Sequence, residues 1–277
     1  MVELLGGADI RQLADSLGVV PTKKLGQNFV TDPNTIRKIV ASAKLAPTET
    51  VVEIGPGLGS LTLGLLEVAE HVISVELDAK MASAIEATVT KRAVGKKFSL
   101  VTQDAMKVTK LPADPTALVA NLPYNISVPV LLHFIETFPT LQHGLVLVQS
   151  EVAHRLAAKP GSKVYGGPSV KLAWWADANL AGNVSRSIFW PIPNVDSSLV
   201  YFAKRAKPMG TEDLRVKTFA LVDAAFSQRR KTLRQALAEF AGSPAQAEAL
   251  LVKAGISPQL RGEQLDINDF LKLAEAV

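Results

Sequence analysis

The sequence predicts an α/β protein: a doubly wound sheet over residues 1–206, followed by a small all-helical domain over residues 207–277. Short apolar runs alternate with helix-like stretches between residues 51 and 122, which is the pattern of parallel βαβ units. A glycine-rich turn follows the first of these runs, where open α/β sheets bind ligands. Beyond residue 206 the strand signals stop, and apolar residues recur at spacings of three, four and seven, which is typical of helices.

Six apolar runs are expected to be strands of the sheet. In chain order they are residues 51–54, 71–75, 98–101, 117–120, 145–148 and 198–202. Between the first two, the Leu and Val residues of 60–69 have the spacing of a helix packed on a sheet. Between the last two, residues 159–163 and 165–168 are too rich in Pro and Gly for regular structure, which predicts a surface loop near the active site.

One helix of the C-terminal domain has recognisable ends. Ser243 is expected to cap it, with Pro244 in the first turn and Gln246 closing a capping box. Gly255 suits the residue that stops the helix.

The composition narrows the class of protein. Hydrophobic residues make up 48% of the chain and charged residues 20%, which is typical of a globular protein. There is no cysteine and there are only four histidines, so we expect no disulfide and no metal site. Neither a membrane-spanning run nor a secretory signal is present in the sequence, which predicts a cytoplasmic protein without a membrane partner. The net charge of +4 points weakly to a polyanionic partner.

The predicted cofactor site starts at the glycine turn, where Gly55, Gly57 and Gly59 follow a strand and precede a helix. Glycines let the backbone turn tightly and let a ligand approach. Such turns also bind NAD, but the dinucleotide fingerprint needs its third glycine at position 60, where this chain has Ser60. The spacing therefore favours a nucleoside without a pyrophosphate.

Two acidic residues follow later strands of the same sheet. Glu76 ends the second strand, where a carboxylate can accept hydrogen bonds from both hydroxyls of a ribose. Asp104 follows the third strand, where it can meet the amino group of an adenine. Singly, Glu76 is explained as well by a solvated acid at a strand end as by a ligand contact, and Asp104 is explained as well by the cap of a turn or helix. Together with the glycine turn, at the carboxyl ends of successive strands, they favour a ligand site.

The strongest single signature is Asn121-Leu122-Pro123-Tyr124, which follows the fourth strand and is expected to be catalytic. It offers an amide oxygen, a backbone carbonyl and an aromatic face in four consecutive positions. Two acceptors that hold both hydrogens of the adenine N6 amine can aim its lone pair, which is otherwise delocalised into the ring. We expect the methyl donor to be a sulfonium cation. Attack of the neutral amine on this cation disperses positive charge and creates none, so positioning of the two reactants can supply up to roughly 7–11 kcal/mol of the rate acceleration. An ordinary turn with a core Tyr is the alternative for any one of these residues.

In these motifs and their order, the chain resembles the small-subunit ribosomal RNA adenine N6-dimethyltransferases of the KsgA type. The resemblance runs from about residue 21 to residue 266. It implies a Rossmann-like methyltransferase domain that uses S-adenosylmethionine to dimethylate two adjacent adenosines near the 3′ end of 16S rRNA, in the 30S subunit or its precursor. The segments that carry it are residues 24–29, 53–59, 121–126, 149–153, 194–197 and 229–234.

The resemblance also implies roles for individual residues. Asn121 and the Leu122 carbonyl would hold the target amine, and Tyr124 and Phe189 would enclose the flipped adenine, because N6 is inaccessible inside a stacked helix. Phe189 is also explained as simple core. The residues implied to contact S-adenosylmethionine are Asn28, the backbone of Val30, Gly55, Gly57, Glu76, Asp104 and Asn121.

Three departures from the family pattern are visible. Val30 stands where the family usually has Leu, which matters little for a backbone contact. Residues 184–186 read Val-Ser-Arg where the family often has Val-Pro-Pro, so we expect a less rigid loop before Phe189. Pro168 replaces a usual Leu.

A basic segment in the helical domain predicts where RNA binds. Arg229, Arg230, Lys231 and Arg234 carry four positive charges with no acid between them. On a helix, Arg230 and Arg234 would share a face suited to tracking phosphates. Lys23 and Lys24, next to the predicted cofactor contact, are expected to guide RNA across the mouth of the site.

Two other functions stay open at this point. The antibiotic-resistance branch of the same superfamily methylates an adenine of the large-subunit 23S rRNA, and a non-catalytic assembly factor can use the same fold. The intact Asn121 and Tyr124 argue against the second. We expect a monomer.

Overall fold

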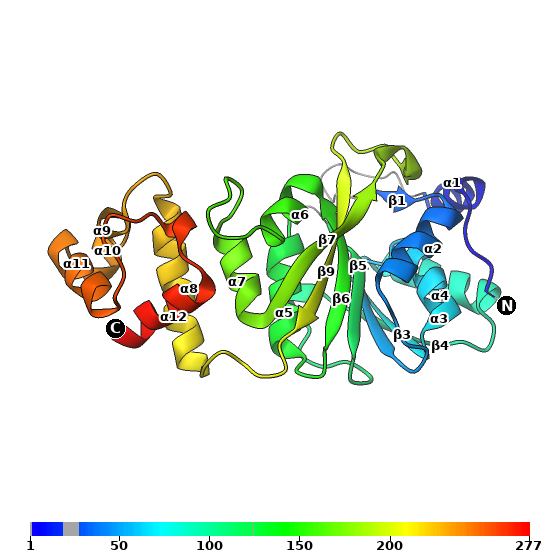
Figure 1. Cartoon of the computed structure of the whole chain (residues 1–277). Helices are drawn as coiled ribbons and strands as arrows, with labels where there is room; N and C mark the ends of the chain where they lie inside the picture. Colours follow the sequence, from blue (N-terminus) through cyan, green and yellow to red (C-terminus); the bar gives the residue numbers. More distant parts are fainter. Residues whose placement is uncertain (1, 19–27, 124) are drawn as a thin grey trace. The chain divides into compact units, whose positions relative to one another are not determined.

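The computed structural model describes residues 2–18, 28–123 and 125–277 (Figure 1). These residues divide into two compact units. The first comprises the described parts of Met1–Ala153 and Asn179–Lys204, and the second comprises His154–Ala178 and Arg205–Val277.

A seven-stranded sheet organises the first unit, in the order β4-β3-β2-β5-β6-β9-β7. The strands from β4 to β6 run parallel to their neighbours, whereas β9 runs antiparallel to β6. All six predicted strands are confirmed. The seven strands of the sheet, of which only β7 was not predicted, are β2 (Thr50–Ile54), β3 (His71–Glu76), β4 (Lys97–Thr102), β5 (Ala117–Asn121), β6 (His143–Gln149), β7 (Ala176–Val184) and β9 (Ser197–Lys204).

The order of the strands determines where a ligand can bind. From β2 the chain moves outward through β3 to β4, and then returns to the other side of β2 with β5. Connections therefore leave the carboxyl ends of β2 and β5 in opposite directions, which opens a crevice between them. The predicted doubly wound sheet is confirmed.

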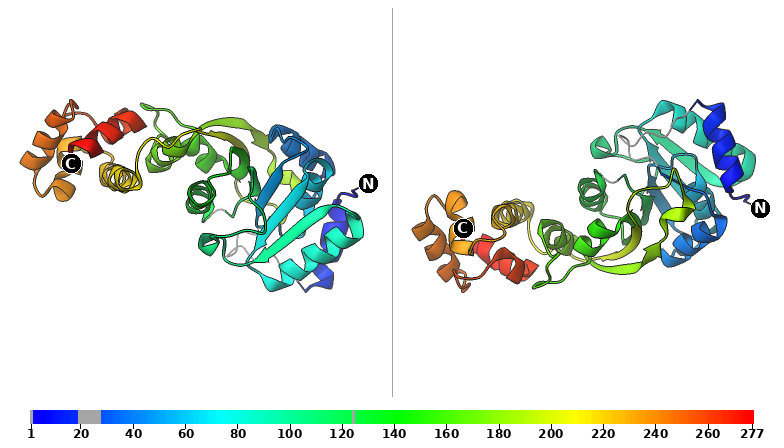
Figure 2. Two further views of the ribbon diagram at one scale, coloured as in Figure 1. Left: turned by 90° about the horizontal axis from the view of Figure 1, so that it is seen from below. Right: turned by 90° about the horizontal axis from the view of Figure 1, so that it is seen from above.

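Helices cover both faces of this sheet. Figure 1 shows α2, α3 and α4 on one face and α5 on the other, and the views in Figure 2 agree. The helical segments that begin in this unit are α1 (Gly7–Ser16), α2 (Pro33–Ser42), α3 (Ser60–Val68), α4 (Ala79–Arg92), η2 (Ala105–Lys107), α5 (Ser127–Thr137), α6 (Ser150–Leu156) and η3 (Arg186–Ile188). A separate two-stranded ribbon pairs β1 (Phe29–Val30) antiparallel to β8 (Phe189–Trp190).

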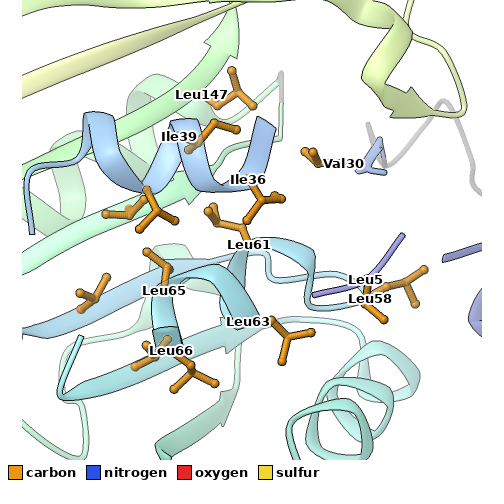
Figure 3. Packing of buried hydrophobic residues seen from close by; sticks show 14 of the residues in the cluster. Leu5, Val30, Ile36, Ile39, Leu58, Leu61, Leu63, Leu65, Leu66 and Leu147 are labelled. Carbon is orange, nitrogen blue, oxygen red and sulfur yellow. The ribbon is translucent and has the colours of Figure 1, made fainter. Parts of the chain in front are cut away.

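Apolar side chains from these helices form one core with the sheet. Figure 3 shows Leu61 and Leu65 of α3 with Ile36 and Ile39 of α2, beside Leu147 of β6. Leu65 is fully buried, and α3 is apolar around most of its circumference because α2 covers the side that faces away from the sheet. The core thus fixes α3, and with it the glycine turn that precedes this helix.

The second unit has a hydrophobic core of its own, which includes Trp174, Leu221 and Phe270. Its helices are α7 (Gly167–Trp175), α8 (Glu212–Ser227), α9 (Leu233–Ala236), α10 (Ala238–Ala241), α11 (Pro244–Lys253), η4 (Gly262–Gln264) and α12 (Ile267–Ala276). The predicted helical C-terminal region is confirmed.

The boundary between the units differs from the expected division after residue 206 in one segment. His154–Ala178 groups with the C-terminal helices, because Tyr165, Val170 and Trp174 are buried in their core. The Tyr165 hydroxyl also donates to the Leu265 carbonyl at 2.9 Å.

Two local expectations in this unit need correction. Residues 159–163 are irregular as predicted, but α7 starts at Gly167 with Pro168 in its first turn, where a missing N–H costs nothing. At α11, Ser243 caps the Gln246 N–H at 3.2 Å and Gly255 follows the helix with a φ of 72°, as expected. The Gln246 side chain, however, accepts from the Ser243 hydroxyl instead of closing a box on its backbone.

Candidate active site

A cavity of about 410 Å³ lies at the carboxyl ends of β2, β3, β4 and β5. It is the crevice that the strand order predicts, and all of its lining residues belong to the first unit. The cavity brings together nine of the predicted site residues. They are Asn28, Val30, Gly55, Gly57, Glu76, Asp104, Asn121, Leu122 and Pro123.

The glycine turn needs its glycines for backbone geometry and for space. Gly55, Gly57 and Gly59 have φ angles of 68°, 56° and 94°, a region that residues with a side chain rarely adopt. A Cβ on Gly57 would lie 2.8 Å from Cε1 of Phe29. The turn can therefore pack against β1 and still leave its backbone exposed to the cavity.

Glu76 is held in place by backbone donors on both sides. Its Oε1 accepts from the N–H groups of Leu77 at 2.8 Å and Asp78 at 3.0 Å. Its Oε2 accepts from the Gly57 N–H at 3.3 Å, which directs this oxygen toward the glycine turn. Burial raises the pKa of Glu76, although the three N–H groups oppose the rise.

Glu53 also lines the cavity, although its position in the sequence predicted no individual role for it. Its side chain is buried, and Oε2 accepts from the hydroxyls of Thr62 at 2.6 Å and Ser74 at 2.8 Å. Burial raises the pKa of Glu53 to about 7. A signal was available, because Glu53 is the single charged residue in the otherwise apolar run 51–54, which leads into the glycine turn.

Asp104 caps a short helix and also lies at the cavity. Its Oδ1 accepts from the Met106 N–H at 3.0 Å and so caps the short helix η2. The residue also lines the cavity. A cap that uses one carboxylate oxygen fixes the orientation of the other.

Asn121, the last residue of β5, connects the sheet to the segment before β1. Its Nδ2 donates to the Asn28 carbonyl at 3.2 Å, across 93 residues of sequence. This bond defines the orientation of the amide, so Oδ1 is the atom that remains to accept a hydrogen bond.

The residues after Asn121 are fixed through their backbone. The Leu122 N–H donates to the Leu147 carbonyl at 3.0 Å, and the Leu122 side chain is buried. The Pro123 carbonyl accepts from the Ile126 N–H at 3.3 Å, which closes a turn at the start of α5. Tyr124 lies outside the described residues, as do Lys23 and Lys24.

Phe189 does not line the cavity. It lies in β8, opposite Val30 of β1, and is buried in the main core of the unit with 3% of its surface exposed. The preceding η3 is capped by Ser185, whose hydroxyl accepts from the Ser187 N–H. The Ile188 carbonyl accepts from both the N–H and the hydroxyl of Thr31 at 2.8 Å.

The basic segment is not arranged as predicted. Arg229, Arg230 and Lys231 lie in the turn between α8 and α9, and Arg234 lies in the short α9, so no single helix carries Arg230 and Arg234 on one face. The reason is that α8 ends at Ser227, and Thr232 starts a new helix.

Two of the four basic residues of this segment form ion pairs with acidic residues, and the other two do not. Arg229 forms an ion pair with Glu263 at 2.9 Å and donates to the Lys163 carbonyl, while Arg234 pairs with Glu248 at 2.6 Å. Arg230 and Lys231 are exposed and make no ion pair with any residue that the structure describes.

The described part of the chain contains neither a cluster of metal ligands nor a helix that could span a membrane. Within residues 2–18, 28–123 and 125–277, no three His, Cys, Asp or Glu residues come together in an arrangement that could bind a metal ion. No helix in these ranges has both the length and the apolar character needed to cross a membrane.

Comparison of the sequence with known proteins gives one consistent result. The sequence profile of the family "Ribosomal RNA adenine dimethylase" matches residues 21–277. A relative from Streptomyces griseus, named ribosomal RNA small subunit methyltransferase A, is 59% identical over 275 residues, which cover 98% of this chain and 94% of the relative.

Solved structures agree on the fold. A dimethyladenosine transferase from Plasmodium falciparum is 27% identical and superposes with a TM-score of 0.75 over 88% of this chain and 95% of its own. The 23S rRNA methyltransferase ErmE is 25% identical, with a TM-score of 0.67 over 90% of this chain and 98% of its own.

Proposed function

Because this chain belongs to the ribosomal RNA adenine dimethylase family, we propose that it transfers methyl groups from S-adenosylmethionine to adenine N6 in 16S rRNA. It adds two methyls to each of two adjacent adenosines near the 3′ end, within the 30S subunit or its precursor, and so takes part in ribosome biogenesis. The observation that carries this proposal is Asn121, whose amide orientation leaves Oδ1 as an acceptor at the cavity.

The chemistry of the cavity fits S-adenosylmethionine. Glu53 and Glu76 line it, and burial raises the pKa of both because it disfavours the ionised carboxylates. A cationic ligand offsets this penalty by its attraction to the ionised forms. The glycine turn allows the close approach of a nucleoside. S-adenosylmethionine supplies a methyl group activated by a sulfonium centre.

Individual residues divide the work of holding the nucleoside. Glu76 binds the ribose, and its Oε2, with the long 3.3 Å contact to Gly57, is the oxygen that a hydroxyl can share. Asp104 accepts from the adenine amine of the cofactor while Oδ1 stays on its cap. Asn28, the Val30 backbone and Gly55 complete the contacts.

The target adenine is held by acceptors and by aromatic rings. Asn121 Oδ1 and the Leu122 carbonyl accept the two N–H groups of N6, and Tyr124 stacks on the base. Each transfer replaces one N–H hydrogen with a methyl and releases a proton, so the second transfer has one N–H left to hold. Phe189 serves as the second wall of the base site, which requires RNA binding to uncover its buried ring.

RNA is bound through its phosphates by the turn between α8 and α9, the basic turn, which carries Arg229, Arg230 and Lys231. Arg230 and Lys231 are the phosphate contacts, because both are exposed and make no ion pair with a described residue. Arg229 and Arg234 support the turn through Glu263 and Glu248. Lys23 and Lys24 guide RNA toward the mouth of the cavity.

Methylation of 23S rRNA is the nearest alternative. It has less support, since the relative that is 59% identical is named for the small subunit, whereas the 23S enzyme is 25% identical. A non-catalytic assembly factor would not require the amide orientation of Asn121.

The test uses small subunits that lack these methyl groups, together with large subunits as the competing substrate. They are incubated with the protein and S-adenosylmethionine labelled in its methyl group, and the rRNA is then digested to nucleosides. We expect label in N6,N6-dimethyladenosine and none with Asn121→Ala. Label in large-subunit RNA or on cytosine would contradict the proposal, and absence of label with intact protein would favour the assembly factor.

A further inference from the structure

We propose that the N-terminal arm, residues 2–16, is part of the scaffold of the cofactor cavity, and that Arg92 is the residue that clamps it there. The inference rests on the proposed function, because it concerns the affinity for S-adenosylmethionine. The arm lies before residue 21, where the family match begins. Four observations support the clamp.

Arg92 is the last residue of α4 and contacts the arm at three points. Its Nη2 pairs with Asp9 Oδ1 at 2.6 Å, and its Nη1 donates to the Leu4 carbonyl at 3.3 Å. Its own carbonyl accepts from the Glu3 N–H at 3.0 Å. A guanidinium can satisfy a carboxylate and a carbonyl together because its donors are held in a fixed fork.

The contact with Asp9 also determines where helix α1 begins. The second carboxylate oxygen, Oδ2, accepts from the Gly6 N–H at 2.8 Å, one residue before the helix. This backbone bond and the Arg92 guanidinium lower the pKa of Asp9, although burial opposes the shift. One carboxylate therefore couples the start of α1 to the end of α4.

The arm buries its apolar side chains in the core that supports the cavity. Leu5 and Ile10 are almost completely buried, in the same cluster as Leu58 of the glycine turn and Val30 of β1. Figure 3 shows Leu5, Leu58 and Val30 in this cluster. Leu58 and Val30 both line the cavity.

Both elements that the arm touches reach the cavity directly. At the other end of α4, Met81 lines the cavity, and Ile85 approaches so closely that a Cβ on Gly59 would lie 3.1 Å from its Cδ1. On the opposite side, Gly7 of α1 lies against Thr31, the residue after β1. The arm thus contacts α4 and the residue after β1, and it shares an apolar core with Leu58 of the glycine turn.

The test compares Arg92→Ala with Lys91→Ala. Lys91 is the matched control, because it is exposed, precedes Arg92 on the same helix and carries the same charge. We expect Arg92→Ala to raise the Kd for S-adenosylhomocysteine about fivefold or more, in calorimetric titrations well below the melting temperature. The KM for S-adenosylmethionine should rise likewise, while the KM for the small subunit stays unchanged. Lys91→Ala should leave all three values as in the wild type.

A double-mutant cycle with Asp9→Ala distinguishes a clamp from a general loss of stability. The double variant should bind S-adenosylhomocysteine no more weakly than the weaker single variant, because the two side chains act through each other. Arg92→Lys keeps the charge but not the fork, so its Kd should lie between those of wild type and Arg92→Ala.

Three results would overturn the clamp: a Kd for Arg92→Ala within twofold of wild type, an equal change in Lys91→Ala, or additive effects in the cycle. If the proposed cofactor were wrong, the wild-type protein itself would fail to bind S-adenosylhomocysteine. A wrong RNA target would show in the labelling of nucleosides and would leave the comparison of Kd values intact.

Discussion

Glu53 shows how a single buried carboxyl can make stability depend on pH. Its folded-state pKa of about 7 lies above the ordinary value of 4.5, so the folded protein holds a proton that the unfolded chain releases between these values. The stabilisation from this proton is complete below pH 4.5 and is lost as the pH rises through 7. Above pH 7, folding must bury a charge.

We therefore expect Glu53→Gln to stabilise the protein much more at pH 8 than at pH 5. The amide stays neutral, and its oxygen can still accept from Thr62 and Ser74. The gain at pH 8 should approach roughly 3 kcal/mol, since one pKa unit corresponds to about 1.4 kcal/mol. Urea denaturation at both pH values measures it, with Glu70→Gln as an exposed control. An equal gain at pH 5 and pH 8 would show that the proton is not its cause.

Asn121 is expected to need both ends of its amide. Asn121→Asp keeps an acceptor oxygen but removes the Nδ2 donor and sets a carboxylate against the Asn28 carbonyl. The segment that carries Asn28 should then shift, and a misplaced reactant typically costs about 10²-fold in rate. Single-turnover methylation of small subunits measures the loss. If Asn121→Asp were as active as wild type while Asn121→Ala was inactive, the donor to Asn28 would have no role.

At the level of elements, the strands were the most predictable part of the fold. Runs such as residues 117–120 are buried on both faces of a parallel sheet, so they consist almost entirely of apolar residues. β7 was missed, because its nine residues alternate Ala with polar residues and Gly, and most of them are exposed. An edge strand of this kind lacks the apolar run on which the prediction depends.

Site residues were predictable where a motif follows the end of a strand. They were not predictable where the role of a residue depends on a partner that only the fold brings close. Gly57, Glu76, Asp104 and Asn121 all line the cavity, as their positions after successive strands predict. Phe189 was not resolvable from sequence, because a buried ring and a stacking ring have the same local pattern. In the basic segment, Glu263 and Glu248 lie 34 and 14 residues away from their arginines, so sequence alone could not show which charges they neutralise.

Because Arg230 and Lys231 make no ion pair with a described residue and Arg234 does, charge reversal should affect RNA binding at the first two and stability at the third. Arg230→Glu with Lys231→Glu should weaken binding to small subunits and reduce the slope of log K against log salt by about 1.5, since each lost phosphate contact removes about 0.7–0.9. Arg234→Glu should instead lower thermal stability, by breaking its pair with Glu248. Lys217→Glu, an exposed cation on α8, is the control. Equal slopes for the double variant and this control would rule out phosphate contacts in the basic turn.

For the whole molecule, ligand binding should be felt unequally by the two units. The cavity is lined only by residues of the first unit, and each unit has its own hydrophobic core. We expect S-adenosylhomocysteine to slow amide hydrogen exchange around residues 53–58 and 76–81 and to leave α8, α11 and α12 unchanged. Mass spectrometry with and without the ligand measures this. Equal protection in both units would mean that the ligand stabilises the chain as one cooperative block.

The pairing of β1 with β8 has a consequence for how the protein is made. Val30, which lines the cavity, pairs with Phe189, and Asn28 is held by Asn121, so the site joins segments that leave the ribosome far apart in time. Contacts between distant segments form late in folding, because a long loop must close before they can form. A nascent chain whose synthesis has not yet reached residue 189 should therefore be unable to complete its cofactor cavity. We therefore expect methylation activity to begin only after synthesis of the chain has passed β8.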